Sequence, residues 1–230
     1  MKKVLHFQIR YVILLSYRFP ILYEESGDHM TKAEIANKVL SEKNSIADTG
    51  AFLAAGLSRS DVSRLVHSGV LVRIRHGLYQ SAENTDLSEA AYLSRLIPEG
   101  ILCVESALFH YGYSDFTPRE WSLAVPRAIS QRKIKSCTVP VHVYYIQPDV
   151  YELGRTQAAF GGTVLSVYDK ERTVCDCFKY RTKLDPELFA KAVHAYAADP
   201  KKDLANLSKY AKMMRIYQSV TDMMEVLLNG

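Results

Sequence analysis

The sequence is poor in cysteine, and its few cysteines lack the spacing that zinc sites use. The thiols are those of Cys103, Cys137, Cys175 and Cys177. None belongs to a Cys-x-x-Cys motif and no histidine-rich segment follows them, so we expect no metal site. The last two flank Asp176 in a predicted helix, where packing as small apolar side chains is the expected role. We expect reduced thiols in a cytoplasmic protein.

Long apolar runs are also missing. The best run, residues 12–15, is too short to cross a bilayer and is soon interrupted by Arg18. A regular apolar pattern begins only at Met30, and the codons of residues 27–29 can contain a purine-rich ribosome-binding element just before an ATG. We therefore expect residues 1–29 to be a mis-annotated or disordered leader, with a genuine N-terminal arm as the alternative. We expect no membrane partner.

Catalytic motifs are absent as well. The sequence contains no Glu-x-Lys of metal-dependent nucleases, no His-Glu-x-x-His and no Gly-x-Ser-x-Gly. Its one Asp-x-Lys, residues 199–201, falls in a loop between predicted helices. Gly161 and Gly162 fit a turn better than a phosphate-binding loop. We expect a protein that is not an enzyme and that needs no cofactor.

A strong net charge is the last feature missing. The 29 basic and 25 acidic side chains leave only +4 over 230 residues, so any nucleic-acid surface must be local. This length allows one large domain or two small ones.

What the sequence does contain is a helix, a glycine turn, a second helix and a short hairpin within residues 49–80. Ser58 is a good N-cap for the second helix, and Asp61 three positions later fits a capping box. Val62 and Leu65 lie at helical spacing on one apolar face, and Gly69 ends the helix. This order of elements predicts a winged helix-turn-helix, which lays its second helix in the DNA major groove.

The opposite face of that helix carries arginine and serine, which contact phosphates and base edges. Residues 70–74 and 78–79 form the predicted wing, with basic residues near its turn. The predicted DNA-binding residues are Arg59, Ser60, Ser63, Arg64, His67, Arg73, Arg75 and His76. The alternative is an ordinary amphipathic helix with a solvated basic face.

A second domain follows a polar linker at residues 81–85. Its pattern is a helix over 87–97, β-branched and aromatic strands over 121–125 and 139–147, and a further strand at 163–167. From Tyr168 onward the pattern is helical. We therefore predict an α+β protein: a leader over 1–29, a winged helix-turn-helix over 30–82, and an α+β domain over 86–230 with a small sheet and a helical C-terminal half.

Two blocks of this sequence resemble the AbiEi family of type IV antitoxins. The first is GLSRSDVSRLVHSGVLVRIRHGLY, and the second is SVYDKERTVCDCFKYRTKL, followed near the end by LANLSKYAKMMRIYQSV. The resemblance implies a repressor that binds inverted repeats in its own promoter. It also implies a C-terminal domain that neutralises a nucleotidyltransferase-like toxin without a stable complex, as in abortive infection and phage defence.

Two further predictions concern the second domain. Lys179, Arg181 and Lys183 are the candidate antitoxin surface, although solvated helix and loop faces are the simpler interpretation. The aromatic side chains at Tyr111, Tyr113, Phe116 and Trp121 fit core packing, but they could also line a pocket. The alternative function is therefore a winged-helix transcriptional regulator that senses a small molecule through its C-terminal domain.

Overall fold

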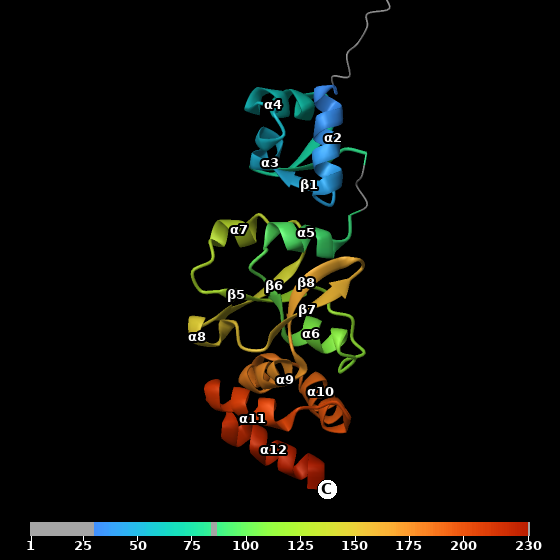
Figure 1. Ribbon diagram of the computed structural model, residues 1–230. Coiled ribbons are helices and arrows are strands. Elements are labelled where there is room, and N and C mark those ends of the chain that lie inside the picture. The colour runs from blue at the N-terminus through green and yellow to red at the C-terminus, as the bar shows by residue number, and fades with distance from the viewer. Residues whose placement is uncertain (1–29, 84–86, 230) are drawn as a thin grey trace, which may run out of the picture.

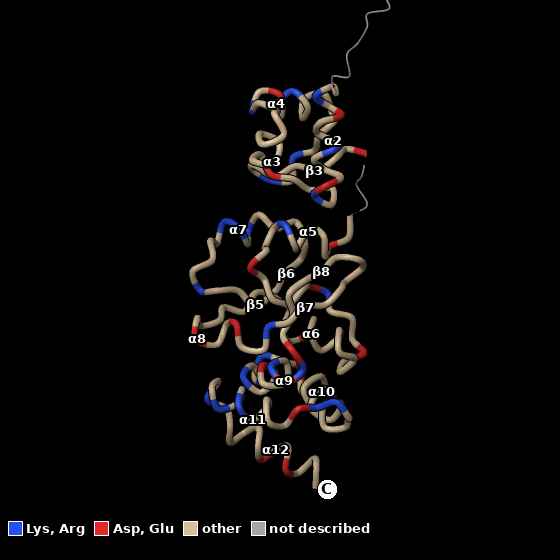
Figure 2. Tube along the Cα trace, viewed as in Figure 1, with Lys and Arg blue, Asp and Glu red and all other residues tan. Residues whose placement is uncertain are grey.

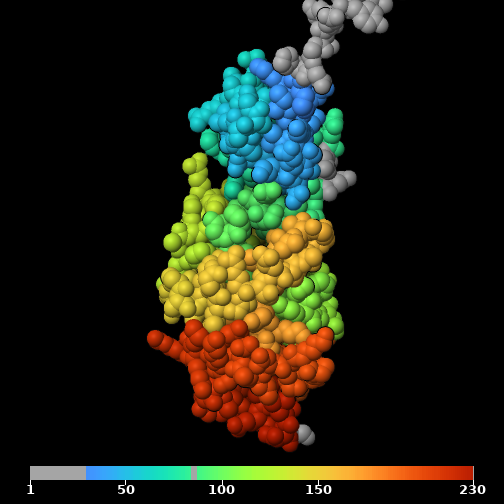
Figure 3. All heavy atoms as spheres, viewed as in Figure 1, coloured from blue at the N-terminus to red at the C-terminus, as the bar shows by residue number. Residues whose placement is uncertain are grey.

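The computed structural model describes residues 30–83 and 87–229; the predicted leader at 1–29 lies outside these residues. The molecule is an elongated stack with a winged-helix part at one end, a sheet with its helices in the middle, and a helical end (Figure 1). The same three bands are visible in the space-filling view (Figure 3). The predicted α+β class is confirmed, with small sheets and a helical C-terminal half.

The winged-helix part comprises residues 31–82. Its helices are α2 (Lys32–Glu42), α3 (Thr49–Ala54) and α4 (Arg59–His67). Its strands are β1 (Ile46–Asp48), β2 (Leu71–Arg75) and β3 (Leu78–Ser81), in the antiparallel order β1-β3-β2. Phe52, Val62 and Leu71 are each at most 2% exposed and lie in one apolar cluster that joins the helices to the sheet.

Two local features of this part were not predicted from the sequence. Strand β1 lies between α2 and α3 and pairs with β3. Asn44 and Ser45 both have positive φ, and this turn lets three residues of strand follow α2 directly. The N-cap of α3 is Asp48, whose carboxylate accepts from the Ala51 N–H at 2.8 Å.

The second part, residues 87–229, is built on a five-stranded sheet in the order β6-β5-β4-β8-β7. The strands are β4 (Ile101–Leu102), β5 (Trp121–Pro126), β6 (Val141–Ile146), β7 (Arg155–Phe160) and β8 (Thr163–Tyr168). The pairs β5–β6 and β4–β8 are parallel, whereas β4–β5 and β7–β8 are antiparallel. The predicted turn at Gly161 and Gly162 joins β7 to β8, and both glycines have positive φ.

Helices cover both faces of this sheet. The helices between the strands are α5 (Glu89–Leu96), α6 (Val104–His110), α7 (Gln131–Lys135) and α8 (Pro148–Tyr151). Leu123 and Val125 of β5 pack in the cluster of α5, while Ala124 between them packs in the cluster of α6 and the C-terminal helices. This alternation is the period of two expected for a strand that is buried on both faces.

The C-terminal end is helical, as predicted. Its elements are α9 (Lys170–Lys179), the 3-10 helix η1 (Arg181–Lys183), α10 (Pro186–Ala198), α11 (Leu204–Met213) and α12 (Tyr217–Asn229). Asp169 and Asp203 are the N-caps of α9 and α11. Cys103, Cys175 and Cys177 are free and buried, which confirms the packing interpretation for the latter two; Cys137 is free and partly buried.

The winged-helix part is docked on α5. Ile46 and Leu78 belong to the small sheet, but their side chains pack with Leu93 and Leu96 of α5 and not in the apolar cluster of the winged-helix part. Polar contacts surround this apolar contact. The Arg75 guanidinium donates to the carbonyls of Leu96 at 3.1 Å and Arg95 at 3.4 Å, which lie in the last turn of α5. A cation is favoured there because helical carbonyls at the C-terminus carry partial negative charge.

Across the same contact, Arg95 donates back to the Lys43 carbonyl at 2.8 Å, and the Tyr92 hydroxyl donates to Gln80 at 2.7 Å. Together these contacts fix how the winged helix sits on the rest of the chain.

Replacing Arg75 should therefore affect stability rather than DNA contact. Arg75→Ala removes two charge-assisted hydrogen bonds to α5, so we expect a loss of about 1–3 kcal/mol in the free energy of unfolding. Urea denaturation of the full chain measures it. The control is Arg73→Ala, which removes an exposed arginine on the same strand and should leave stability within about 0.5 kcal/mol. Equal stability of wild type and Arg75→Ala would show that the docking contact contributes nothing.

Candidate nucleic-acid interface

Helix α4 begins with a complete capping box. The Asp61 N–H donates to Ser58 Oγ at 3.1 Å, and the Ser58 N–H donates to the Asp61 carboxylate at 3.0 Å. The reciprocal pair satisfies two backbone donors that have no partner within the helix. The predicted cap is confirmed, and so is the helix end, because Gly69 follows the Ser68 C-cap with φ of 75°.

The one acidic side chain of α4 is neutralised by a cation that the sequence analysis did not single out. The Nζ of Lys32, at the start of α2, lies 2.5 Å from Oδ1 of Asp61. The Lys32 ammonium and the Ser58 donors hold the pKa of Asp61 well below its usual range. Asp61 is 7% exposed and Lys32 is 58% exposed, so the outer surface presents the cation. The sequence analysis could not find the Lys32–Asp61 pair, because the two residues are far apart in the sequence and meet only when α2 packs beside α4.

The exposed face of α4 divides into two rows. Arg59, Ser63 and His67, spaced by four, line a groove with a volume of about 500 Å³ between α4 and the hairpin. Arg73 and His76 line the same groove from the β2–β3 hairpin. The structure therefore brings together five of the predicted DNA-binding residues, from two elements, around one concave surface.

Ser60 and Arg64 form the second row, outside the groove. Arg64 is 74% exposed, with its guanidinium 3.9 Å from Asp61. Ser60 lies at the helix start, with its hydroxyl 2.8 Å from Ser58 Oγ. Both rows are exposed, and Figure 2 shows basic segments on α4 and at the nearby start of α2, at the free end of the stack.

Tyr79 supports the groove from below. Its ring packs edge-on against Phe52, with 6.0 Å between centroids, and it is 7% exposed. The Arg73 guanidinium lies 5.8 Å from the centre of the same ring. An arginine held over an aromatic ring keeps its donors at the surface while its position is restricted. Arg73 is thus a positioned cation at the groove wall.

Arg75 does not line this groove, so the structure places it apart from the other predicted DNA-binding residues of the wing. Its side chain is half-buried and its guanidinium is used by the carbonyls of Leu96 and Arg95. A register shift between Arg73 and Arg75 separates the two arginines on β2. Strand alternation alone places both on one face, so the sequence pattern could not have distinguished their environments.

The predicted antitoxin residues lie at the end of α9 and in η1 but face different surroundings. The Lys179 ammonium donates to the Met214 carbonyl at 3.3 Å, and the Arg181 guanidinium lies 4.7 Å from the centre of the Phe189 ring. The Lys183 ammonium lies 5.8 Å from the Tyr180 ring. All three are exposed. Lys179 and Arg181 line two separate cavities, so the three cations do not form a single continuous face.

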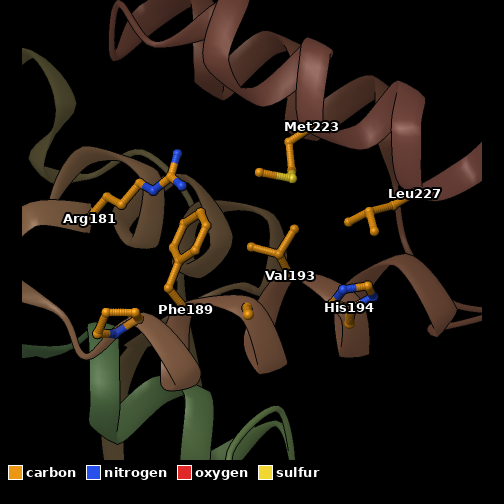
Figure 4. A pocket seen from close by; sticks show the side chains of 8 residues that line it. Arg181, Phe189, Val193, His194, Met223 and Leu227 are labelled. Atoms are coloured by element: carbon orange, nitrogen blue, oxygen red, sulfur yellow. The ribbon is translucent and has the colours of Figure 1, made fainter.

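The cavity beside Arg181 is mainly apolar. It lies between α10 and α12 and has a volume of about 320 Å³. Figure 4 shows Phe189 and Val193 of α10 opposite Met223 and Leu227 of α12, with Arg181 at the edge. Such a surface packs against apolar groups rather than binding phosphates.

The aromatic residues predicted to pack or to line a pocket lie in different environments. Tyr113 is 4% exposed and donates to Asp199, and the Tyr111 hydroxyl donates to the Tyr168 carbonyl. These two are core residues. Phe116 is 57% exposed, while Trp121 donates to Glu89 at 2.6 Å.

The described residues contain neither a metal-binding cluster nor a membrane-spanning helix. Within residues 30–83 and 87–229, no group of three His, Cys, Asp or Glu side chains is placed to hold a metal ion. Over the same residues, no helix has the length and apolar character needed to span a bilayer.

The structure is similar to the crystal structure of the RV2827C protein from Mycobacterium tuberculosis, with a TM-score of 0.57. The two sequences are 16% identical over 87% of this chain and 81% of that one, so the likeness concerns the fold alone. No curated protein matches the sequence significantly. A protein-family model described as "Transcriptional regulator, AbiEi antitoxin" matches residues 34–82, which contain α4, the groove and the wing. The match covers the winged-helix part alone, and this part is therefore similar to AbiEi antitoxin transcriptional regulators.

Proposed function

We propose that this protein is the antitoxin of a type IV toxin–antitoxin system that also represses its own promoter. The observation that carries the proposal is the groove between α4 and the wing, lined by Arg59, Ser63, His67, Arg73 and His76. It combines a capped helix, exposed cations and small polar side chains. These are the groups that contact phosphates and base edges in the major groove.

The arrangement of the molecule supports major-groove binding by α4. Helix α4 lies at the end of the stack that is far from α12 (Figure 1), so the second part leaves it open to a duplex. Arg64 projects with 74% of its side chain exposed and suits a guanine edge, to which arginine donates two hydrogen bonds. Arg73 on the wing suits a neighbouring phosphate.

Binding to inverted repeats follows from the family resemblance. Two copies of one chain on a pair of inverted half-sites would each place α4 in a major groove, with the half-sites about one helical turn or a multiple of it apart. We propose this paired occupancy for promoter DNA in the cytoplasm.

The antitoxin role belongs, in this proposal, to the second part of the chain. The winged-helix part carries a DNA-reading face of its own, whereas residues 87–229 contribute a separate sheet and a helical end. We propose the division into domains at 30–82 and 86–230 on that basis. The second domain would neutralise a nucleotidyltransferase-like toxin without a stable complex, and Lys179, Arg181 and Lys183 are the candidate residues.

We propose no catalytic role, in keeping with a family of regulators. A ligand-sensing transcriptional regulator is the second candidate function, and the neighbouring gene distinguishes it from an antitoxin. A gene for a nucleotidyltransferase immediately downstream supports the antitoxin role, whereas the regulator needs no such neighbour.

Base reading by α4 is tested at Arg64. Arg64→Ala should weaken promoter binding by about 1–3 kcal/mol and relax preference at one base pair, because a bidentate arginine–guanine contact is lost. Titration of labelled promoter duplexes that differ at single base pairs measures both effects. The matched control is Lys38→Ala, which removes an exposed cation of α2 that does not line the groove. Unchanged affinity of an Arg59→Ala, Arg64→Ala double variant would rule out this face.

The wing gives a different expected result. Arg73→Ala should weaken binding to all sequences alike and reduce the slope of log affinity against log salt by about one, since a phosphate contact is lost. A change of base preference in this variant, with an unaltered salt slope, would contradict the assignment of Arg73 to phosphate.

The antitoxin surface is tested by charge reversal in the full chain. Lys179→Glu with Arg181→Glu should impair rescue of growth from the neighbouring toxin while the melting temperature changes little, because both side chains are exposed. Lys201→Glu with Lys209→Glu reverses two other exposed charges of the same part and should rescue normally.

Residues 30–85 alone should fail to rescue growth, since they lack the second domain. Full rescue by this fragment would mean that the second domain is dispensable, and the division of roles would be wrong.

A further inference from the structure

A cavity at the edge of the five-stranded sheet combines a buried carboxylate oxygen that has no hydrogen-bond partner among the described residues with basic side chains at its rim. Its volume is about 780 Å³, within the range of about 300–1,000 Å³ common for small-molecule sites. It lies beyond the carboxyl ends of β5 and β6, with α9 and the end of α11 completing the wall. Strands β5 and β6 are parallel neighbours. Ligands of open α/β sheets bind at this end of parallel strands.

The floor of this cavity holds a buried ion pair with one unused acceptor. Arg172 and Asp176 are each 1% exposed, and the Arg172 Nε donates to Asp176 Oδ1 at 3.1 Å. The Arg172 guanidinium also donates to the carbonyls of Val150 and Leu153, so it is fixed in place. Asp176 Oδ2, in contrast, is buried and has no hydrogen-bond partner within residues 30–83 and 87–229.

A buried carboxylate oxygen without a donor is costly. Burial raises the pKa of Asp176 to about 6, although Arg172 opposes the shift. Because Arg172 pairs with Oδ1, Oδ2 is left as an acceptor at the cavity wall, and it suits a ligand that brings an N–H donor.

The rim of the cavity is cationic. Arg127 follows β5, Lys179 ends α9 and Arg215 follows α11, and all three are exposed and line the cavity. Asp149 is an acidic residue of the same wall. Tyr145 and Tyr180 add aromatic surface. Cations around a polar pocket that also holds two aromatic rings and one buried acceptor match a ligand with phosphates, a flat ring and N–H groups.

Arg215 supports this assignment through its backbone. It has φ of 60°, a conformation that suits glycine at the position after a helix. The Ile216 N–H donates to the Ala211 carbonyl at 2.9 Å, which completes the helix end around it. An arginine is thus present at a strained position where glycine would cost less, and its side chain lines the cavity.

We propose that this cavity binds a nucleotide, with the phosphates on Arg127, Lys179 and Arg215 and an N–H group of the base on Asp176 Oδ2. The proposal does not depend on DNA binding by α4.

The test is calorimetric titration of the full chain with ATP, GTP, CTP and UTP, and separately with inorganic triphosphate. We expect at least one nucleotide to bind, and triphosphate to bind about tenfold more weakly, because it leaves Asp176 without a donor. Equal binding of triphosphate, or no binding of any nucleotide, would overturn the proposal. Tighter binding of a short single-stranded RNA that is lost in Arg215→Gly combined with Arg127→Ala would also overturn it, in favour of an RNA site.

Arg215→Gly separates binding from folding. It removes a rim cation and relieves the strained φ, so nucleotide binding should fall about tenfold while the melting temperature stays the same or rises. Arg132→Ala is the matched control, since it removes an exposed cation that does not line the cavity, and it should bind normally. Binding that survives Arg215→Gly combined with Arg127→Ala, yet is lost in Arg59→Ala with Arg64→Ala, would place the nucleotide on the DNA face and contradict the proposal.

Discussion

The docking of the winged-helix sheet on α5 determines where the proposed DNA-binding face points. Ile46 and Leu78 bury apolar surface against Leu93 and Leu96, and Arg75 ties the β2–β3 hairpin to the carbonyl end of α5. Because one side of the small sheet is occupied in this way, α4 remains at the free end of the molecule (Figure 1). A single contact therefore orients one functional surface relative to the other.

The same contact explains how two arginines of one strand take different roles. Arg73 stays exposed over Tyr79 and lines the groove, whereas Arg75 is half-buried between the two parts of the chain. The partial negative charges of the helical carbonyls stabilise the Arg75 guanidinium, and the electron-rich face of the Tyr79 ring stabilises the Arg73 guanidinium. The position of α5 therefore determines which of the two arginines stays exposed beside the groove.

The features that the sequence predicted well are those with local causes. The capping box of Ser58 and Asp61, the apolar face of Val62 and Leu65, and the stop at Gly69 depend on residues within one helix. Features that depend on distant partners were not predictable. Strand β1 exists because β3 pairs with it, and Lys32 joins Asp61 only when α2 lies beside α4. The cavity beneath Arg215 draws on β5, β6, α9 and α11, which no sequence pattern links.

The central claim is that α4 and the β2–β3 hairpin contact duplex DNA. Hydrogen–deuterium exchange of the full chain, with and without its promoter duplex, tests this claim most directly. The account predicts added protection over residues 59–67 and 71–78, and none over α12. Protection confined to the C-terminal helices, with exchange in α4 unchanged, would contradict it.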